Sequence, residues 1–375
     1  MLSRKERLTR QALLQDIDTL PSIGGWMLSA RNLAFTAGLT QEAYLENPTQ
    51  GFIKANHALK VDGIVNGPVI PNKPDVIRTG SLSEESYPDR DPAEVLADAD
   101  KIPDDPKALL KDFNAEAVRN EYRELFARHR AIYDGMEVVP NFWDLGGPFP
   151  LYWTYGYTAF FEACALYPDA IGKIWWSRCV VARERAKILA PLYKELDLLP
   201  LLFCGEDLCN NSGPMVSPAM IRKHYFPHVK TIAEPLVDAG VRMVHHCDGD
   251  VRPFLQDFLD LGYSGFQGFQ YECGVDVCEL RKLKPTLGEK PLIFGGLSVS
   301  RTLPFGSPDD VRREVDYLVD ATDGGRGLFL FTSNVTGYEV PAENIIAGYQ
   351  QIKARAPYIR GTPPAAKWPV VSPRM

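Results

Sequence analysis

Several features that mark other classes of protein are missing from this chain of 375 residues. It has no apolar run of about 20 residues that would span a bilayer. Its formal net charge is −7, and it contains no cluster of Lys or Arg that would form a basic surface. No Gly-x-Gly-x-x-Gly follows a candidate strand, and no Walker-type loop is present. We therefore expect no membrane or nucleic-acid partner, and the support for a nucleotide-binding fold is weak.

Disulfide spacing is also missing. The seven cysteines are an odd number without the pattern of a disulfide framework. Four of the first seven residues are charged and no apolar stretch follows them, which predicts no secretion signal. Free thiols in a reducing cytoplasm are the expected state.

What the chain does contain is an alternation of short apolar runs with helical patterns. The helix signals include a capping box from Ser307 to Asp310. The alternation favours parallel βα units, five of them after residue 199 and two or three before it. We predict a single domain over residues 1–375, a (β/α)8 TIM barrel with an N-terminal helical extension. Residues 1–60 are expected to be helices that pack on the barrel, and residues 80–105 a surface excursion.

Polar side chains follow three of the predicted strands. Glu206 and Asp207 follow the run 199–204, His245 to Asp250 end the run 241–246, and Asn334 follows the run 328–332. Because the carboxyl ends of barrel strands meet on one face, these groups are expected to converge there.

Strand alternation restricts which of these groups share a face. His246 falls on the same side as Asp248, and His245 on the same side as Cys247, so only one pair points into the barrel mouth. Either pair contains ligands for Zn²⁺ or groups for acid/base catalysis.

A segment rich in aromatic residues lies between residues 141 and 157. Its turn-rich sequence favours a lining for an apolar or planar ligand, with core packing as the alternative. The aromatic residues are Phe142, Trp143, Phe149, Tyr152, Trp153, Tyr155 and Tyr157.

The second half of the chain resembles the uroporphyrinogen decarboxylase superfamily in the order and spacing of several short motifs. They are Glu206-Asp207, Gly213–Pro218, Phe226–His228, His246–Asp250, Gly295–Leu297, Gly306–Val311 and Pro341–Asn344. This resemblance implies a uroporphyrinogen decarboxylase-like barrel with its active site at the carboxyl mouth. The superfamily contains the decarboxylase and corrinoid-dependent methyltransferases.

The decarboxylase itself grips its substrate carboxylates with paired arginines in an N-terminal stretch. The corresponding region here, residues 21–31, holds one arginine, Arg31. Because bidentate arginine normally binds such carboxylates, heme biosynthesis is disfavoured.

Family members that act on thiols carry His-x-Cys-Gly and a late Cys, which bind zinc. Here the corresponding positions are His246, Asp248 and Asn334. Oxygen ligands replace both thiolates, which argues against thiol activation. The resemblance leaves two alternatives: a zinc site of His246, Asp248 and Glu206, with Cys247 as a substitute ligand, or a metal-free site with the same groups.

The pattern is most similar to the methyltransferases of O-demethylase systems, which pass a methyl group to the Co(I) of a separate corrinoid (cobalamin) protein. This implies an aryl methyl ether as substrate and a corrinoid protein that docks at the barrel mouth. The expected catalytic residues are His246, Asp248, Glu206 and Asn334, and the expected substrate contacts are Trp143, Phe149, Tyr152, Trp153 and Cys247.

Two other hypotheses remain open. One is a decarboxylase of a small aromatic or pyrrolic acid, with Asp248 or Glu206 as the acid. The other is a non-catalytic barrel subunit or ligand binder. The sequence is compatible with an oligomer.

Overall fold

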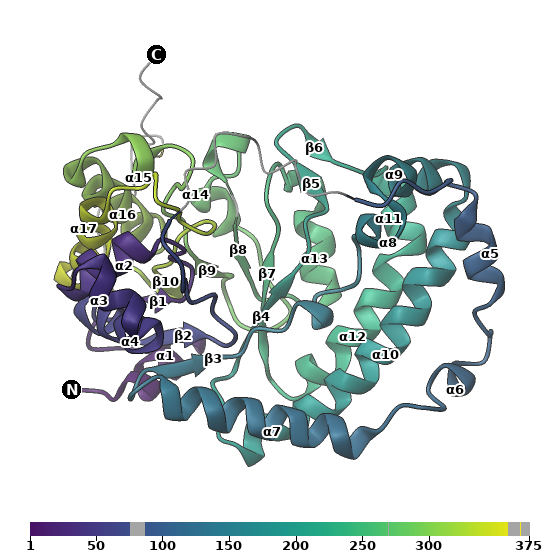
Figure 1. The fold of residues 1–375 in the computed structure, drawn as a ribbon, viewed down its shortest axis with the longest axis horizontal. Coiled ribbons are helices and arrows are strands. Elements are labelled where there is room, and N and C mark those ends of the chain that lie inside the picture. The colour runs from purple at the N-terminus through teal and green to yellow at the C-terminus, as the bar shows by residue number, and fades with distance from the viewer. Residues whose placement is uncertain (76–86, 269, 359–367, 369–375) are drawn as a thin grey trace.

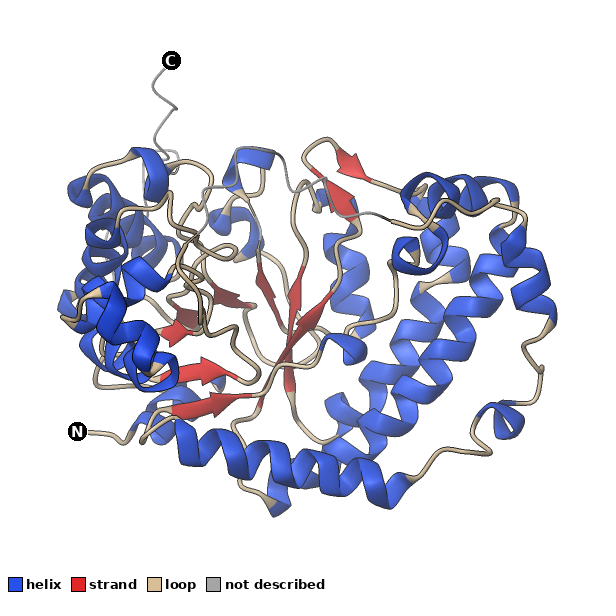
Figure 2. Cartoon of the chain, in the orientation of Figure 1, coloured by secondary structure: helices blue, strands red, loops and turns tan. Residues whose placement is uncertain are grey.

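The computed structural model describes residues 1–75, 87–268, 270–358 and 368. In this part of the chain, eight parallel strands lie at the centre and helices surround them (Figures 1 and 2). The barrel strands are β1 Ile23–Gly24, β2 Gly63–Val65, β3 Glu137–Val139, β4 Leu201–Gly205, β7 Arg242–His246, β8 Gly265–Gln267, β9 Leu292–Phe294 and β10 Leu328–Phe329.

Each barrel strand lies beside the strand that precedes it in the chain. Strands β1 to β3 form one parallel sheet, and β4, β7, β8, β9 and β10 form another. Isolated parallel bridges join the two sheets on both sides, one between Asn141 and Phe203 and one between Ser22 and Leu330. The predicted (β/α)8 architecture is therefore confirmed, with two seams that are single bridges and not continuous ladders.

The helices make up the outer layer. They are α1 Arg4–Ala12, α2 Ala30–Ala37, α3 Gln41–Glu46, α4 Pro48–Ala58, α5 Glu94–Asp100, α6 Pro106–Leu109, α7 Ala115–Ile132, α8 Tyr152–Tyr155, α9 Tyr157–Leu166, α10 Pro168–Glu195, α11 Pro218–His224, α12 Phe226–Asp238, α13 Leu255–Leu261, α14 Val277–Leu280, α15 Thr302–Phe305, α16 Pro308–Ala321 and α17 Ala342–Ala354. Single 3-10 turns span Trp143–Leu145, Arg252–Phe254 and Tyr271–Cys273. A short antiparallel pair, β5 Cys209–Asn210 and β6 Gly213–Pro214, follows β4.

Local capping chemistry explains where some helices begin. At the start of α16, the Ser307 side chain accepts a hydrogen bond from the Asp310 backbone, and the Asp310 carboxylate accepts one from the Ser307 backbone. This is the predicted capping box, and it satisfies two amide groups that the helix leaves free. The Ser217 side chain makes no such bond at the start of α11, where Pro218 occupies the first turn.

Apolar side chains fill the inside of the barrel. They alternate along the strands with residues that face the helices, as the pleat of a strand requires. The interior set includes Ile23, Val65, Val139, Leu201, Phe203, Val244, Leu292, Phe294, Phe329 and Phe331. The barrel is therefore a packed core, and its chemistry is confined to the mouth.

Helix α1 packs against this interior set. Its Leu8 and Ala12 side chains are completely buried in the same cluster. The helix is also held by Arg7, whose guanidinium lies 2.7 Å from carboxylate oxygens of both Asp18 and Asp62. Helix α2 packs on α3, α4 and α17.

The predicted surface excursion is only partly covered by the structure. Residues 80–86 lie outside the described residues, and α5 lies in the remainder.

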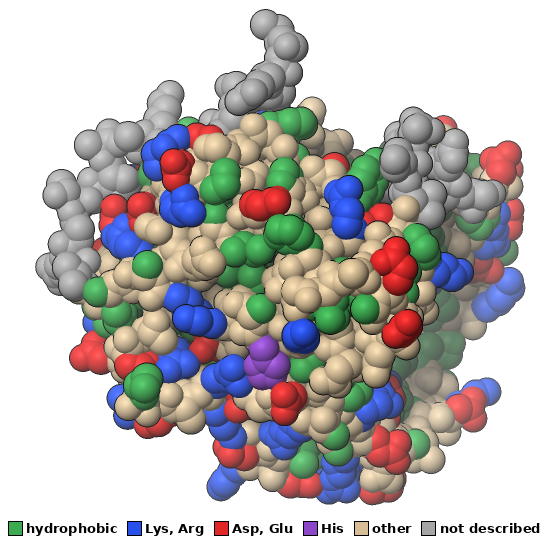
Figure 3. Space-filling model, turned by 60° about the vertical axis from the view of Figure 1, so that its left-hand side comes forward, with side chains coloured by type: hydrophobic (Ala, Val, Ile, Leu, Met, Phe, Trp, Pro, Cys, Tyr) green, Lys and Arg blue, Asp and Glu red, His purple; other side chains and the backbone are tan. Residues whose placement is uncertain are grey.

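On the face drawn in Figure 3, acidic and basic side chains are interspersed. No helix among the described residues combines the length and hydropathy that crossing a bilayer requires.

Candidate active site

The carboxyl ends of β4 and β7 bring three chemically active side chains together. The Nε2 atom of His246 lies 3.5 Å from Asp207 Oδ1 and 3.8 Å from Asp248 Oδ1. Ligand atoms of all three residues lie within 4.8 Å of one another, the arrangement required to hold one metal ion. We call Asp207, His246 and Asp248 the mouth cluster.

The register of neighbouring strands fixes the ring of His246. Gln267 is its direct partner on β8, and the Gln267 amide oxygen hydrogen bonds with His246 Nδ1. The Gln267 Nε2 group donates to the backbone oxygens of Thr332 and Ser333, at 3.0 and 3.1 Å. Because the amide nitrogen is used in this way, its oxygen must accept from Nδ1–H. Neutral His246 therefore directs the lone pair of Nε2 at the two carboxylates.

A lone pair facing two carboxylate oxygens is electrostatically unfavourable. A cation between them removes the repulsion, either a proton on Nε2 or a metal ion bound to it. One imidazole nitrogen and two carboxylate oxygens are suitable ligands for Zn²⁺, and three protein ligands leave a fourth position for substrate. The mouth cluster therefore fits both a zinc site and a metal-free acid/base site.

Asp248 is held by two further contacts. Its backbone N–H donates to Asp207 Oδ1 at 2.8 Å, and its Oδ2 atom accepts from the Asn334 side-chain amide. The Val335 backbone N–H donates to the oxygen of that amide, which fixes its orientation. Burial raises the pKa of Asp248 to about 6; His246 and the Asn334 bond oppose this rise, and Asp207 adds to it. Such a carboxyl can release and accept a proton near neutral pH.

Glu206, predicted as a ligand and catalytic group, lies outside the mouth cluster. Burial raises its pKa well above the usual value. Burial raises the pKa of Tyr225 and of Tyr263, two tyrosines in the packing around the barrel, and the charge of Glu206 adds to both rises. Gly205, immediately before it, has a φ of +148°. Asp207 occupies the place that the sequence assigned to Glu206.

His246 also lies against two tryptophans. The rings of Trp26 and Trp143 lie 6.4 Å apart and nearly parallel, with an angle of 16°. Both meet the imidazole edge-on, at centroid distances of 5.7 and 5.3 Å. Phe203 and Phe331 complete the aromatic surroundings. Trp143 thus lies where a substrate contact was predicted.

The other predicted substrate contacts are divided between the rim and the core. Tyr152 and Trp153 belong to an aromatic group with Tyr87 and Tyr157. The side chains of Trp153 and Tyr157 are 56% and 49% exposed, so this group forms part of the surface. Burial raises the pKa of Tyr152 to about 12, and the charge of Asp207 adds to this rise.

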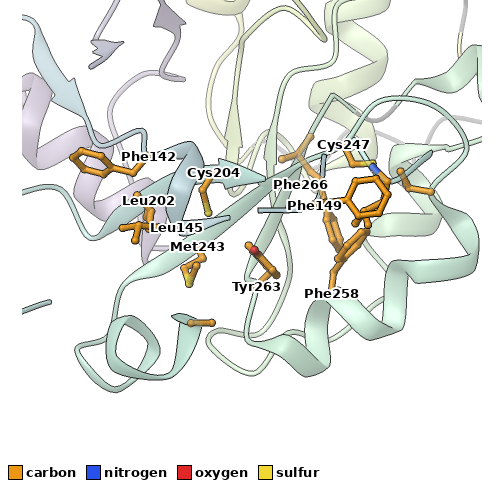
Figure 4. Packing of buried hydrophobic residues seen from close by; sticks show 14 of the residues in the cluster. Phe142, Leu145, Phe149, Leu202, Cys204, Met243, Cys247, Phe258, Tyr263 and Phe266 are labelled. Atoms are coloured by element: carbon orange, nitrogen blue, oxygen red, sulfur yellow. The ribbon is translucent and has the colours of Figure 1, made fainter. Parts of the chain in front are cut away.

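Phe149 and Cys247, also predicted as substrate contacts, are completely buried in the core. Phe149 is buried against Phe160, Trp175 and Tyr225. Cys247 is completely buried, and its sulfur accepts from the Leu208 backbone N–H at 3.3 Å. Figure 4 shows both within the packing between strands and helices. Cys247 therefore lies outside the mouth cluster in this structure.

The choice between the two histidines is now settled. His245 points away from the mouth and packs on Phe258 and Tyr263, with ring centroids at 3.9 and 4.6 Å. His246 and Asp248 are the pair that faces inward, one of the two alternatives that strand alternation had left open.

The sequence did not identify three residues of this site: Trp26, Asp207 as a ligand, and Gln267. Gln267 ends β8 and is paired with His246 at the end of β7, so strand register contained a signal for it. Trp26 follows β1, a two-residue strand in a Gly-rich segment that gave no strand signal.

A parallel α/β barrel with an imidazole and two carboxylates at its carboxyl mouth defines a class of TIM-barrel proteins whose catalytic groups come from strand ends. A comparison with family models agrees with the resemblance seen in the motifs. Residues 206–354 match the model described as uroporphyrinogen decarboxylase (URO-D). The resemblance to this superfamily is therefore supported over the part of the chain that contains β7 to β10.

A solved structure extends the likeness to the whole fold. It is a methyltransferase from Methanosarcina mazei, 16% identical, matched over 94% of this chain and 99% of that one with a TM-score of 0.59. At this identity the match concerns the fold. No curated protein matches the sequence.

Proposed function

We propose that this protein is a methyltransferase that transfers the methyl group of an aryl methyl ether to the Co(I) of a corrinoid on a partner protein. The observation that carries the proposal is the mouth cluster, where His246 Nε2 faces two carboxylates beside Trp26 and Trp143. The URO-D match and the methyltransferase fold support the same reading.

The chemistry of an ether explains why such a cluster is needed. The corrinoid supplies a strong nucleophile, but a phenoxide departs poorly unless its oxygen is protonated or polarised. Asp248, with a pKa of about 6, and His246 are the groups able to deliver a proton to that oxygen. Zn²⁺ bound by Asp207, His246 and Asp248 would supply Lewis-acid polarisation at the same place.

The surrounding residues have supporting roles in this proposal. Gln267 fixes the orientation and tautomer of His246, and Asn334 orients Asp248. Asn334 was expected among the catalytic residues, and its bond to Asp248 favours a positioning role. Trp26 and Trp143 offer flat apolar faces to an aryl ring. The corrinoid protein would dock at the mouth, next to the aromatic group at the rim.

A single incubation tests the proposal. Purified protein, reduced cobalamin and a panel of methoxyarenes are expected to give methylcobalamin and the free phenol. His246→Ala should lower the rate by about 10²–10⁴-fold, the usual contribution of a positioned acid or base. His57→Ala is the matched control, because His57 is on the surface and pairs with Asp134. If carboxylated analogues instead release CO₂ and no methyl group moves, the protein is a decarboxylase and the proposal is wrong.

A further inference from the structure

Two neighbouring cavities lie outside the barrel, where α6, α10 and α12 meet. The first has a volume of about 380 Å³ and the second about 330 Å³. Both are lined by Trp176 and His228, so they share a wall. Volumes of this size are within the range of small-molecule sites. Figure 1 places these helices at the right-hand side of the molecule.

The first cavity has an apolar surface with an open indole. Leu110, Cys179 and Val180 line it together with Trp176. The preceding residue, Trp175, is buried against Phe149 and Tyr225 on the other side of α10. Trp176 is half-buried and has no ring partner among the described residues. A flat face is therefore available for a planar ligand.

Cations without acidic partners surround this indole. Lys107 and Arg183 line the first cavity and Lys223 lines the second. In the described part of the chain, none of the three has a carboxylate within 4.0 Å. The acids that line the two cavities lie near other basic groups: Glu184 is 2.6 Å from Lys187, Asp104 is 2.8 Å from Lys173, and Asp169 is 3.6 Å from His224. In the first cavity two cations, Lys107 and Arg183, stand against one acid, Glu184, so its lining is cationic in a protein whose net charge is −7.

We propose that the first cavity is a binding site for a small planar ring that carries an anionic group. The ring stacks on Trp176, and the anion lies between Lys107 and Arg183, which offer charge-assisted hydrogen bonds. Aromatic carboxylates and nucleoside monophosphates share this chemistry. None of the residues that line the cavity belongs to the mouth cluster, so the site does not depend on the proposed methyl transfer.

Calorimetric titration of the full-length protein tests this site. The anionic probes are benzoate and adenosine monophosphate, and their neutral counterparts are benzamide and adenosine. At least one anionic probe is expected to bind at least about tenfold more tightly than its neutral counterpart. Binding of benzoate would identify an aromatic carboxylate as the ligand class, and binding of adenosine monophosphate would identify a nucleoside monophosphate.

Variants locate the binding. The double change Lys107→Gln and Arg183→Gln should weaken binding by at least about tenfold. Both side chains are exposed, so the fold should be retained, which circular dichroism verifies. Lys230→Gln, on the exposed side of α12, is the control and should bind as wild type does. The proposal is overturned if neither anion binds up to about 10 mM, if the neutral probes bind equally well, or if the double variant is unchanged.

Discussion

At the scale of single residues, Asp207 and Glu206 present the clearest contrast. They are adjacent, and both are acidic, yet only Asp207 reaches His246. Strand alternation predicts side-chain direction as long as the backbone stays extended. Gly205 interrupts it with a φ of +148°, and a Cβ at this glycine would lie 2.2 Å from the His246 backbone oxygen. The close approach requires glycine, and beyond it the register cannot be read from the sequence.

This contrast gives a prediction about metal binding. If the mouth cluster holds zinc, Asp207→Asn should lower the affinity by at least about tenfold, because it removes a charged ligand. Glu206→Gln is the matched control and should keep its metal, since Glu206 lies outside the cluster. Zinc per chain is measured by mass spectrometry after dialysis against a weak chelator. Loss of zinc in the Glu206 variant alone would restore the assignment made from the sequence.

Glu314 is a second residue with a predictable effect, this time on stability. It is completely buried on α16 and accepts hydrogen bonds from the Ser298 backbone and, at 2.8 Å, from the Trp368 indole. Burial raises its pKa to about 8. The folded protein therefore keeps a proton that the unfolded chain loses above pH about 4.5.

This difference in protonation makes the folded protein less stable as the pH rises. A raised folded-state pKa contributes stability that is complete below pH about 4.5 and is lost as the pH rises to about 8. Over this pH window the free energy of unfolding of wild type should fall by on the order of 3–5 kcal/mol relative to that of Glu314→Gln, since each pKa unit corresponds to about 1.4 kcal/mol. Urea denaturation at pH 5, 6.5 and 8 measures the difference. Glu343→Gln, an exposed change on α17, should show no such trend.

At the scale of elements, the strands of the second half could be predicted and those of the first half only in part. Runs such as Leu292–Phe294 and Leu328–Phe329 are apolar and buried at every position. Strand β1 has two residues, in a segment of Gly and Pro, because its neighbours and not its own sequence determine its conformation. The burial of Phe149 could not be predicted for a related reason: its partners Trp175 and Tyr225 are distant in sequence, so aromatic content alone does not separate core from lining.

Helix α1 shows how an element at the start of the chain stabilises the barrel. Leu8 is completely buried among the interior side chains. Leu8→Ala should cost about 2–5 kcal/mol, because the barrel strands cannot collapse into the cavity it leaves. Leu13→Ala, at the exposed end of the same helix, should cost little. Thermal unfolding of both variants tests this, and equal melting temperatures would mean that α1 does not contribute to the core.

At the scale of the whole molecule, closure of the barrel depends on contacts between distant parts of the chain. The Ser22–Leu330 bridge joins the first strand to the last. Beside it, Asp62 accepts from the Ser22 backbone N–H at 3.0 Å, and its carboxylate pairs with Arg7 on α1 and Lys353 on α17. The buried carboxylate of Asp62 thus connects α1, the seam between β1 and β10, and α17. Sequence patterns could not reveal this network, because its members are separated by up to 346 residues (Arg7 to Lys353).

Asp62→Asn should therefore destabilise the whole fold and not one helix. The change leaves Arg7 and Lys353 without their shared counter-charge in a buried setting, where breaking an ion pair costs about 3–5 kcal/mol. Arg7 retains Asp18, so the loss should fall in the lower part of that range. Urea unfolding should show one transition at a lower midpoint by both circular dichroism and tryptophan fluorescence. Asp197→Asn, which removes an exposed partner of Lys5, should leave the midpoint nearly unchanged. Two separated transitions in the Asp62 variant would show instead that the termini unfold independently of the barrel.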